Sequence, residues 1–196
     1  MIYDKVAGQY DKLFAPFEKR FLKKWRGETL SYLPENSRIL EIGAGTGANF
    51  DFYPKSNCAV ASEVSFKMLA FAKRKTDRIH LVQTDAENLP FPGNLFDAAF
   101  ATLVFCSIPK PENAFAELRR IIKPKGRIIL LEHVRPKGIF GYAFDVLNLF
   151  TTALIEDCFN RQTANLAENS GFKILELKEK AFGAVNLIVC ENEKTG

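Results

Sequence analysis

Apolar runs alternate with amphipathic segments along this chain. The apolar runs predict strands near residues 38–42, 58–62, 79–83, 97–102, 126–132, 172–178 and 185–191. Helical periodicity dominates residues 4–33, and amphipathic helices are expected near 65–75 and 111–122. Such alternation specifies a mostly parallel sheet that is covered by helices on both faces. Ligands of such sheets bind beyond the carboxyl ends of the strands, where the strand order reverses.

Breaker residues mark element boundaries and reveal no second domain. Lys123-Pro124-Lys125-Gly126 is expected to end a helix and start the fifth strand, and Phe182-Gly183 to turn a terminal hairpin. We find no repeat or linker, so we expect one domain over residues 1–196. No secretory signal is visible, and the four cysteines lack metal or CxxC spacing. We therefore expect a cytoplasmic protein without a metal site.

The first candidate chemistry lies where the first strand ends, in Gly43-Ala44-Gly45-Thr46-Gly47. Glycines at alternate positions allow positive φ and leave no Cβ between the backbone and a ligand. Together with Ala48 the loop also satisfies the relaxed dinucleotide fingerprint. By itself the loop is therefore compatible with NAD and with S-adenosylmethionine.

Three acidic residues narrow the choice between NAD and S-adenosylmethionine. Glu41 lies inside the first strand, where it can meet the ammonium of a methionine moiety or a bridging water. Glu63 ends the second strand 20 residues after Gly43, where an acid that binds ribose hydroxyls is expected for either cofactor. Asp85 follows the third strand and can accept a hydrogen bond from an adenine amino group. This third acid favours S-adenosylmethionine.

In this order and spacing the motifs resemble class I S-adenosylmethionine-dependent methyltransferases, and in particular those of quinone biosynthesis and phospholipid methylation. The resemblance spans most of the chain, through residues 3–11, the glycine loop with Glu41, residues 63–69, Asp85-Ala86-Glu87-Asn88-Leu89-Pro90-Phe91, and residues 96–100 and 118–127. It implies a Rossmann-like α/β fold. Its seven-stranded sheet would be mostly parallel with an antiparallel last strand, with helices on both faces and an N-terminal helical cap over residues 1–35.

The resemblance also implies roles for single residues. Glu63 would bind the ribose hydroxyls, although many relatives carry Asp there, and Asp85 would bind the adenine amino group. The Ala86 backbone would meet the adenine edge, and Tyr10 would cap the sulfonium. Val64 and Met68 would flank the adenine ring. The residues expected at the methionine part are Glu41, Gly43, Ala44, Gly45, Asn49 and Thr102, and Gly47 and Glu87 are further expected cofactor contacts.

Two segments outside this common core bear on the methyl acceptor. Phe14, Phe17, Phe21 and Trp25 recur at helical spacing among lysines and arginines. This pattern is typical of a helix that lies on an anionic bilayer, and equally of a helix that packs its aromatic stripe against the domain. Residues 137–160 are largely apolar but too short to span a membrane. We interpret them as a lid over the acceptor, or alternatively as a helix buried against the sheet.

Methyl transfer to a small or lipid-like apolar acceptor is the activity that this pattern favours. The net charge of +4 is modest, and no base-flipping motif follows the fourth strand, so no nucleic-acid partner is expected. His133 is a candidate general base at a strand end, where a structural role is the alternative. Arg161 can orient an acceptor headgroup. A cofactor-binding module without turnover and an NAD-dependent oxidoreductase remain alternatives.

Overall fold

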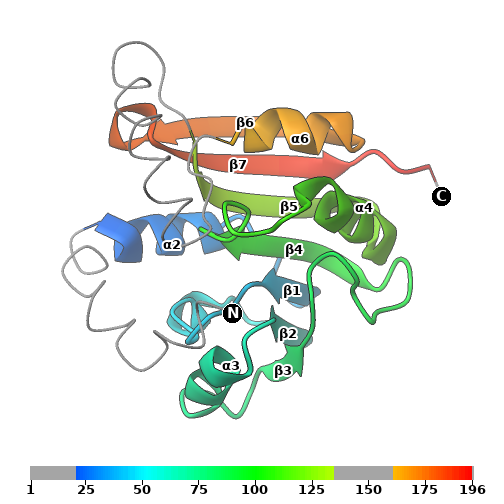
Figure 1. Ribbon diagram of the computed structural model, residues 1–196. Coiled ribbons are helices and arrows are strands. Elements are labelled where there is room, and N and C mark those ends of the chain that lie inside the picture. The colour runs from blue at the N-terminus through cyan, green and yellow to red at the C-terminus, as the bar shows by residue number, and fades with distance from the viewer. Residues whose placement is uncertain (1–20, 135–160, 196) are drawn as a thin grey trace.

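A computed structural model describes residues 21–134 and 161–195 of the protein (Figure 1). The seven expected strands are β1 (Arg38–Ile42), β2 (Cys58–Glu63), β3 (His80–Gln83), β4 (Phe96–Thr102), β5 (Ile122–His133), β6 (Phe172–Lys180) and β7 (Val185–Asn192). They form one sheet in the order β3-β2-β1-β4-β5-β7-β6, in which only β7 runs antiparallel to its neighbours. This confirms the expected fold class. The strand order reverses between β1 and β4, which makes their carboxyl ends the expected ligand site.

Helices cover both faces of the sheet because the central strands are apolar on both sides. Leu40 and Ile42 of β1 face one apolar cluster, which includes α4 (Pro111–Ile121) and α6 (Thr163–Asn169). Ile39, which precedes Leu40, faces a second cluster that includes Leu30 of α2 (Lys23–Leu30). Side chains alternate between the faces of a strand. Glu41 therefore points to the same face as Ile39, the face that α2 covers.

The expected helices are present, with shorter bounds where their ends are described. The helix expected at 65–75 is α3 (Phe66–Lys73), which begins after Ser65 because the Ser65 hydroxyl accepts a hydrogen bond from the Met68 backbone N–H. Two 3₁₀ turns, η2 (Phe50–Phe52) and η3 (Ala181–Gly183), complete the elements, and η3 is the expected turn of the terminal hairpin. The sequence pattern missed α6, which has seven residues.

The start of β5 differs from the sequence expectation. The strand begins at Ile122, directly after α4, and not at Gly126. Pro124 lies inside it, and Lys125 has a φ of +63°. The pairing with β4 shifts there, from Phe96 opposite Ile122 to Ala98 opposite Arg127. The Pro-Lys-Gly segment is therefore a bulge inside a strand. Because the residues of a bulge lie outside the regular ladder, the N–H that proline lacks is not needed there.

Helix α2 is fastened to the far edge of the sheet. The Lys180 ammonium, at the end of β6, donates to the Glu28 carboxylate over 2.7 Å. Lys178 donates to the Tyr32 hydroxyl over 2.6 Å and lies 5.3 Å from the centre of its ring. These contacts hold α2 across the face of β5 and beside the carboxyl ends of the strands (Figure 1).

Candidate active site

The glycine loop turns sharply at the carboxyl end of β1, but its glycines serve different purposes. Gly43, Gly45 and Gly47 all have positive φ, between 54° and 82°. A Cβ at Gly43 would come within 2.5 Å of the Val104 side chain, and one at Gly47 within 2.5 Å of the Phe50 ring. A Cβ at Gly45 would meet nothing within 4 Å. Gly43 and Gly47 are thus required by backbone conformation and packing, whereas Gly45 borders open space on the expected ligand side.

Glu63, at the end of β2, binds the glycine loop directly. One carboxylate oxygen accepts a hydrogen bond from the Gly45 N–H and the other from the Ser65 N–H, both over 2.8 Å. These contacts fix the carboxylate beside the one glycine that borders open space. A carboxylate can accept several hydrogen bonds, so these two from N–H groups do not exclude hydroxyl donors. The geometry is compatible with the expected ribose contact, which stays a prediction.

Glu41 is completely buried and belongs to a polar network on the α2 face. Its two carboxylate oxygens accept from the Tyr53 hydroxyl and from the Asn49 amide, each over 2.5 Å. Burial raises the pKa of Glu41 to about 7, against the opposing effect of these hydrogen bonds and of the Arg26 charge. Burial and the neighbouring Glu41 also raise the pKa of Tyr53 well above its ordinary value. Tyr53 is a site residue that the sequence pattern did not single out.

The same network extends to β4 and to α2. The Asn49 amide also donates to the Thr102 hydroxyl over 2.8 Å. Arg26 of α2 donates to the side-chain amide oxygen of Asn49 over 2.9 Å and to the Thr102 hydroxyl over 2.5 Å. The structure therefore brings together Glu41, Asn49 and Thr102, which the resemblance assigned to the methionine part. It adds Arg26, which the sequence presents only as one of several cations in a basic helix.

Of the residues expected near an adenine, some are exposed to solvent and others are buried or already hydrogen-bonded within the protein. Val64 is 40% exposed and Asp85 is exposed, with one Asp85 carboxylate oxygen accepting from the Glu87 N–H. Met68 is buried in the domain. The Glu87 carboxylate accepts from the Lys110 N–H over 2.9 Å and from the Asn113 amide over 3.2 Å, so it anchors the start of α4. Ala86 is half-buried against the core. Their cofactor contacts stay predictions.

His133 is the last residue of β5 and is half-buried. It lies on the same strand face as Leu131, toward α2. Its neighbour Glu132 was not anticipated. Glu132 is fully buried and accepts from the backbone N–H groups of Val104 and Phe105, over 3.0 and 3.2 Å. Glu132 thereby fixes the loop after β4. Tyr10 and the segment 137–160 lie outside the described residues, so their expected roles are untested.

The sequence and the fold also match known proteins. Residues 40–130 match the model of a family described as a methyltransferase domain. A demethylmenaquinone methyltransferase of Paenarthrobacter aurescens is 30% identical over 69% of this chain and 54% of its own length. A phosphatidylethanolamine N-methyltransferase of Cereibacter sphaeroides is 32% identical over 60% of this chain and 61% of its own. A methyltransferase structure from Thermotoga maritima superposes with a TM-score of 0.76 at 21% identity, covering 97% of this chain and 98% of its own.

Residues 40–130 thus belong to this methyltransferase-domain family, and the fold is that of the class I S-adenosylmethionine-dependent methyltransferases. The chain spans little more than half the length of the demethylmenaquinone methyltransferase. The cofactor of this family is S-adenosylmethionine, and the site fits that group. Gly45 offers open space beside the Glu63 carboxylate, which suits a ribose. The Glu41 carboxylate suits an ammonium.

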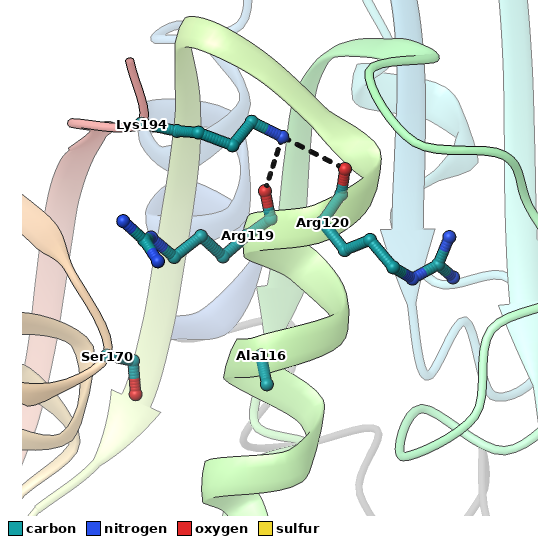
Figure 2. A pocket seen from close by; sticks show the side chains of 5 residues that line it. All are labelled: Ala116, Arg119, Arg120, Ser170 and Lys194. Atoms are coloured by element: carbon teal, nitrogen blue, oxygen red, sulfur yellow. Dashed lines mark hydrogen bonds between the residues drawn. The ribbon is translucent and has the colours of Figure 1, made fainter. Parts of the chain in front are cut away.

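A second polar cluster lies away from this methyltransferase site. It comprises Ala116, Arg119, Arg120, Ser170 and Lys194 around a shallow pocket where α4 ends (Figure 2). The Lys194 ammonium donates to the backbone carbonyls of Arg119 and Arg120, over 3.0 and 3.1 Å. A cation on the last carbonyls of a helix is a C-terminal cap. Since α4 ends where β5 starts, this cluster belongs to the amino edge of the sheet and stabilises the helix end.

Proposed function

We propose that this methyltransferase transfers the methyl group of S-adenosylmethionine to a small or lipid-like apolar acceptor. The observation that carries the proposal is the meeting of three features at the carboxyl ends of β1, β2 and β4. These are the open side of Gly45, the Glu63 carboxylate and the network around Glu41. The names of its relatives point to a demethylated quinone and to phosphatidylethanolamine, both of which are apolar molecules with a polar head.

The chain's own residues would act by binding and orientation. When bound, the cofactor supplies an activated methyl group whose bond to sulfur breaks as the acceptor's nucleophile attacks the carbon. Glu63 would fix the ribose and the Glu41 network the methionine end, so that the methyl faces the acceptor. His133 would take the acceptor's proton where the acceptor carries one. Closure by residues 137–160, proposed as a lid, would exclude water.

Two unsatisfied polar atoms support an acceptor with a polar head. Among the described residues, the buried side-chain atoms without a hydrogen-bond partner are one terminal guanidinium nitrogen of Arg161 and the amide oxygen of Asn186. Buried polar atoms are almost always paired. Asn186 starts β7 opposite Glu132, and Arg161 lies just before α6, so both belong to the carboxyl edge of the sheet. A donor and an acceptor at this edge would suit a hydroxyl, carbonyl or phosphate group of the methyl acceptor.

The acceptor class also suggests how the protein reaches its substrate. No helix within residues 21–134 and 161–195 is long and apolar enough to cross a bilayer. Phe21 is partly exposed at the start of α2, and Lys23 and Lys24 beside it are exposed. We propose that these residues extend the basic aromatic segment of the N-terminal helical cap, residues 1–35, and place the site against an anionic membrane surface.

Ligand binding and turnover together test the proposal. S-adenosylmethionine should raise the melting temperature of the protein, and NAD should not. Labelled methyl groups from S-adenosylmethionine should then appear in a reduced demethylated quinone or in phosphatidylethanolamine presented in mixed micelles. Stabilisation by NAD alone would contradict the assignment. Cofactor binding without transfer to quinones, phospholipids or other apolar acceptors would leave only a cofactor-binding module.

A further inference from the structure

The turn between β6 and β7 displays a phenylalanine that the fold does not bury. Phe182 is 98% exposed, more than any other large apolar side chain in the described part of the chain. Its backbone is left-handed, with a φ of +56°, and its neighbours Ala181 and Gly183 have φ of +49° and +83°. Left-handed backbone is strained for a bulky residue, and glycine or asparagine adopts it more easily. The chain therefore carries backbone strain at a position where the aromatic ring gains almost no contact within the fold.

This turn, η3, lies at the carboxyl edge of the sheet. Lys180 ends β6 opposite Val185 of β7, and Val185 lies opposite His133 at the end of β5. The contacts between β6 and α2 described above hold the end of the hairpin beside that helix (Figure 1). Among the described residues, a Cβ at Gly183 would meet only the end of the Glu179 side chain, at 3.8 Å, so the turn projects from the fold. The aromatic ring is thus displayed at the edge where the acceptor is expected to enter.

A lipid surface suits this arrangement better than a protein partner does. A specific protein interface buries about 800 Å² on each partner, whereas one phenylalanine side chain offers about 150–250 Å². A single ring that projects from a turn can instead enter the boundary between the headgroups and the acyl chains of a bilayer. The start of α2, at the same edge, adds the partly exposed Phe21 and the exposed Lys23 and Lys24 (Figure 1). Ammonium groups beside an apolar ring are complementary to anionic headgroups.

We propose that Phe182 inserts into the anionic lipid surface that holds the methyl acceptor, so that the β6–β7 turn and the start of α2 form two separate points of membrane contact. This inference rests on the proposed function only in placing the acceptor in a lipid surface. Its consequence is orientation. Two points of contact on different elements fix the tilt of the molecule, which a single helix does not, and they direct the carboxyl edge of the sheet toward the lipid.

Phe182→Asn tests the inference because lipid contact and packing within the fold predict different results. Asparagine tolerates left-handed backbone, so the variant should be as stable toward urea as the wild type, or more stable. Its binding to vesicles of phosphatidylcholine and phosphatidylserine should nevertheless fall by at least about tenfold, which is the lower end of what burial of a phenylalanine side chain contributes. Leu175→Thr is the control. It removes a 46% exposed leucine from the middle of β6 and should leave vesicle binding unchanged.

Fluorescence locates the side chain directly. Trp25 is the one tryptophan of the chain, so Phe182→Trp combined with Trp25→Phe gives a fluorophore at the turn alone. Its emission should be that of a solvent-exposed indole in buffer, shift to shorter wavelength when vesicles are added, and be quenched by lipids that carry bromine on their acyl chains. Leu175→Trp in the same Trp25→Phe background should show neither the shift nor the quenching.

Three outcomes would overturn the inference. Unchanged vesicle binding of Phe182→Asn would show that the turn does not meet lipid. A loss of stability in that variant, or short-wavelength emission of Phe182→Trp in buffer, would show that another part of the chain covers the ring. Emission of Phe182→Trp that brominated lipids do not quench would place the turn in water. Failure of the proposed function is a different result, because a wild type that methylates no quinone or phospholipid can still be assayed for vesicle binding.

Discussion

Glu41 and Glu63 show how two carboxylates at neighbouring strand ends acquire different properties. Glu63 accepts from two backbone N–H groups of the glycine loop and of the turn before α3, so it is a fixed hydrogen-bond acceptor. Glu41 lies beneath α2, where burial is the largest influence on its pKa and raises it to about 7. We predict that the first carboxylate accepts hydrogen bonds from hydroxyl groups. The second changes its charge near neutral pH, so we predict that its affinity for an ammonium depends on pH.

Replacing Glu41 with glutamine should change how stability depends on pH. An ordinary glutamate ionises near 4.5, whereas Glu41 in the fold ionises near 7. Between these values the folded protein retains a proton that the unfolded chain releases. The stability that Glu41 contributes is therefore full below about 4.5, falls as the pH rises to about 7, and stays lowered above that. Glu41→Gln lacks this titration.

The difference in the free energy of unfolding between Glu41→Gln and the wild type should consequently shift in favour of the variant from about pH 5 to about pH 8. Urea denaturation at both pH values, without cofactor, measures it. The same variant should bind S-adenosylmethionine more weakly at the higher pH, where it lacks the wild type's charge. A constant stability difference would mean that Glu41 ionises with an ordinary pKa.

Glu63→Ala should reduce the affinity for S-adenosylhomocysteine by at least about tenfold. The variant loses the acceptor of the ribose hydroxyls and leaves the Gly45 and Ser65 N–H groups without their partner. Glu63→Asp is the matched control because it keeps the charge. Calorimetry measures both. An unchanged affinity in the alanine variant would show that the ribose binds at another place.

At the scale of elements, periodicity sufficed for the strands, because the central strands β1 and β4 are apolar runs buried on both faces and the edge strand β6 alternates in burial. Proline and glycine were less reliable as signals of where helices and strands begin and end. Pro124 and Gly126 predict the end of one element and the start of the next, yet they lie in a bulge inside β5. Arg26 could not be separated from its basic neighbours, since only the register of β1 and β4 shows that Glu41 and Thr102 face α2. Partners distant in sequence leave no local pattern.

The start of α3 gives a test at this scale. Ser65 is fully buried, and its hydroxyl accepts from the Met68 N–H over 3.2 Å. Ser65→Ala should lower the free energy of unfolding by about 1 kcal/mol, the usual cost of losing an N-terminal cap, and Ser65→Asn should recover part of it. Chemical denaturation measures the change. Since Ser65 also donates its N–H to Glu63, cofactor affinity should stay within about threefold in both variants, as the backbone contact remains. A larger loss would show that the helix start positions Glu63.

For the whole molecule, the alternation of strands and helices was enough to predict a ligand site at the carboxyl ends of the strands, because the reversal of strand order follows from connectivity. The acceptor could not be placed in the same way. The residues that would select the acceptor, such as Asn186 and Arg161, are distant in sequence, and no sequence pattern shows that they belong to the same edge of the sheet. They come to the same edge of the sheet only once β7 and α6 are folded.

Membrane contact is a property of the whole surface, and charge reversal tests it. Lys23 and Lys24 are exposed at the start of α2, beside the partly exposed Phe21. A lysine near an anionic bilayer contributes about 1 kcal/mol, so Lys23→Glu with Lys24→Glu should lower binding to phosphatidylserine vesicles by more than about tenfold. Lys125→Glu with Lys173→Glu changes the net charge equally, but at the amino edge of the sheet, where β5 and β6 begin. This control should bind nearly as well as the wild type in a vesicle flotation assay. Equal losses in the two double variants would indicate an unspecific effect of net charge, and wild-type protein that fails to float would exclude the contact. With melting temperatures unchanged, a selective loss in the first variant would assign the membrane to the edge that holds the cofactor site.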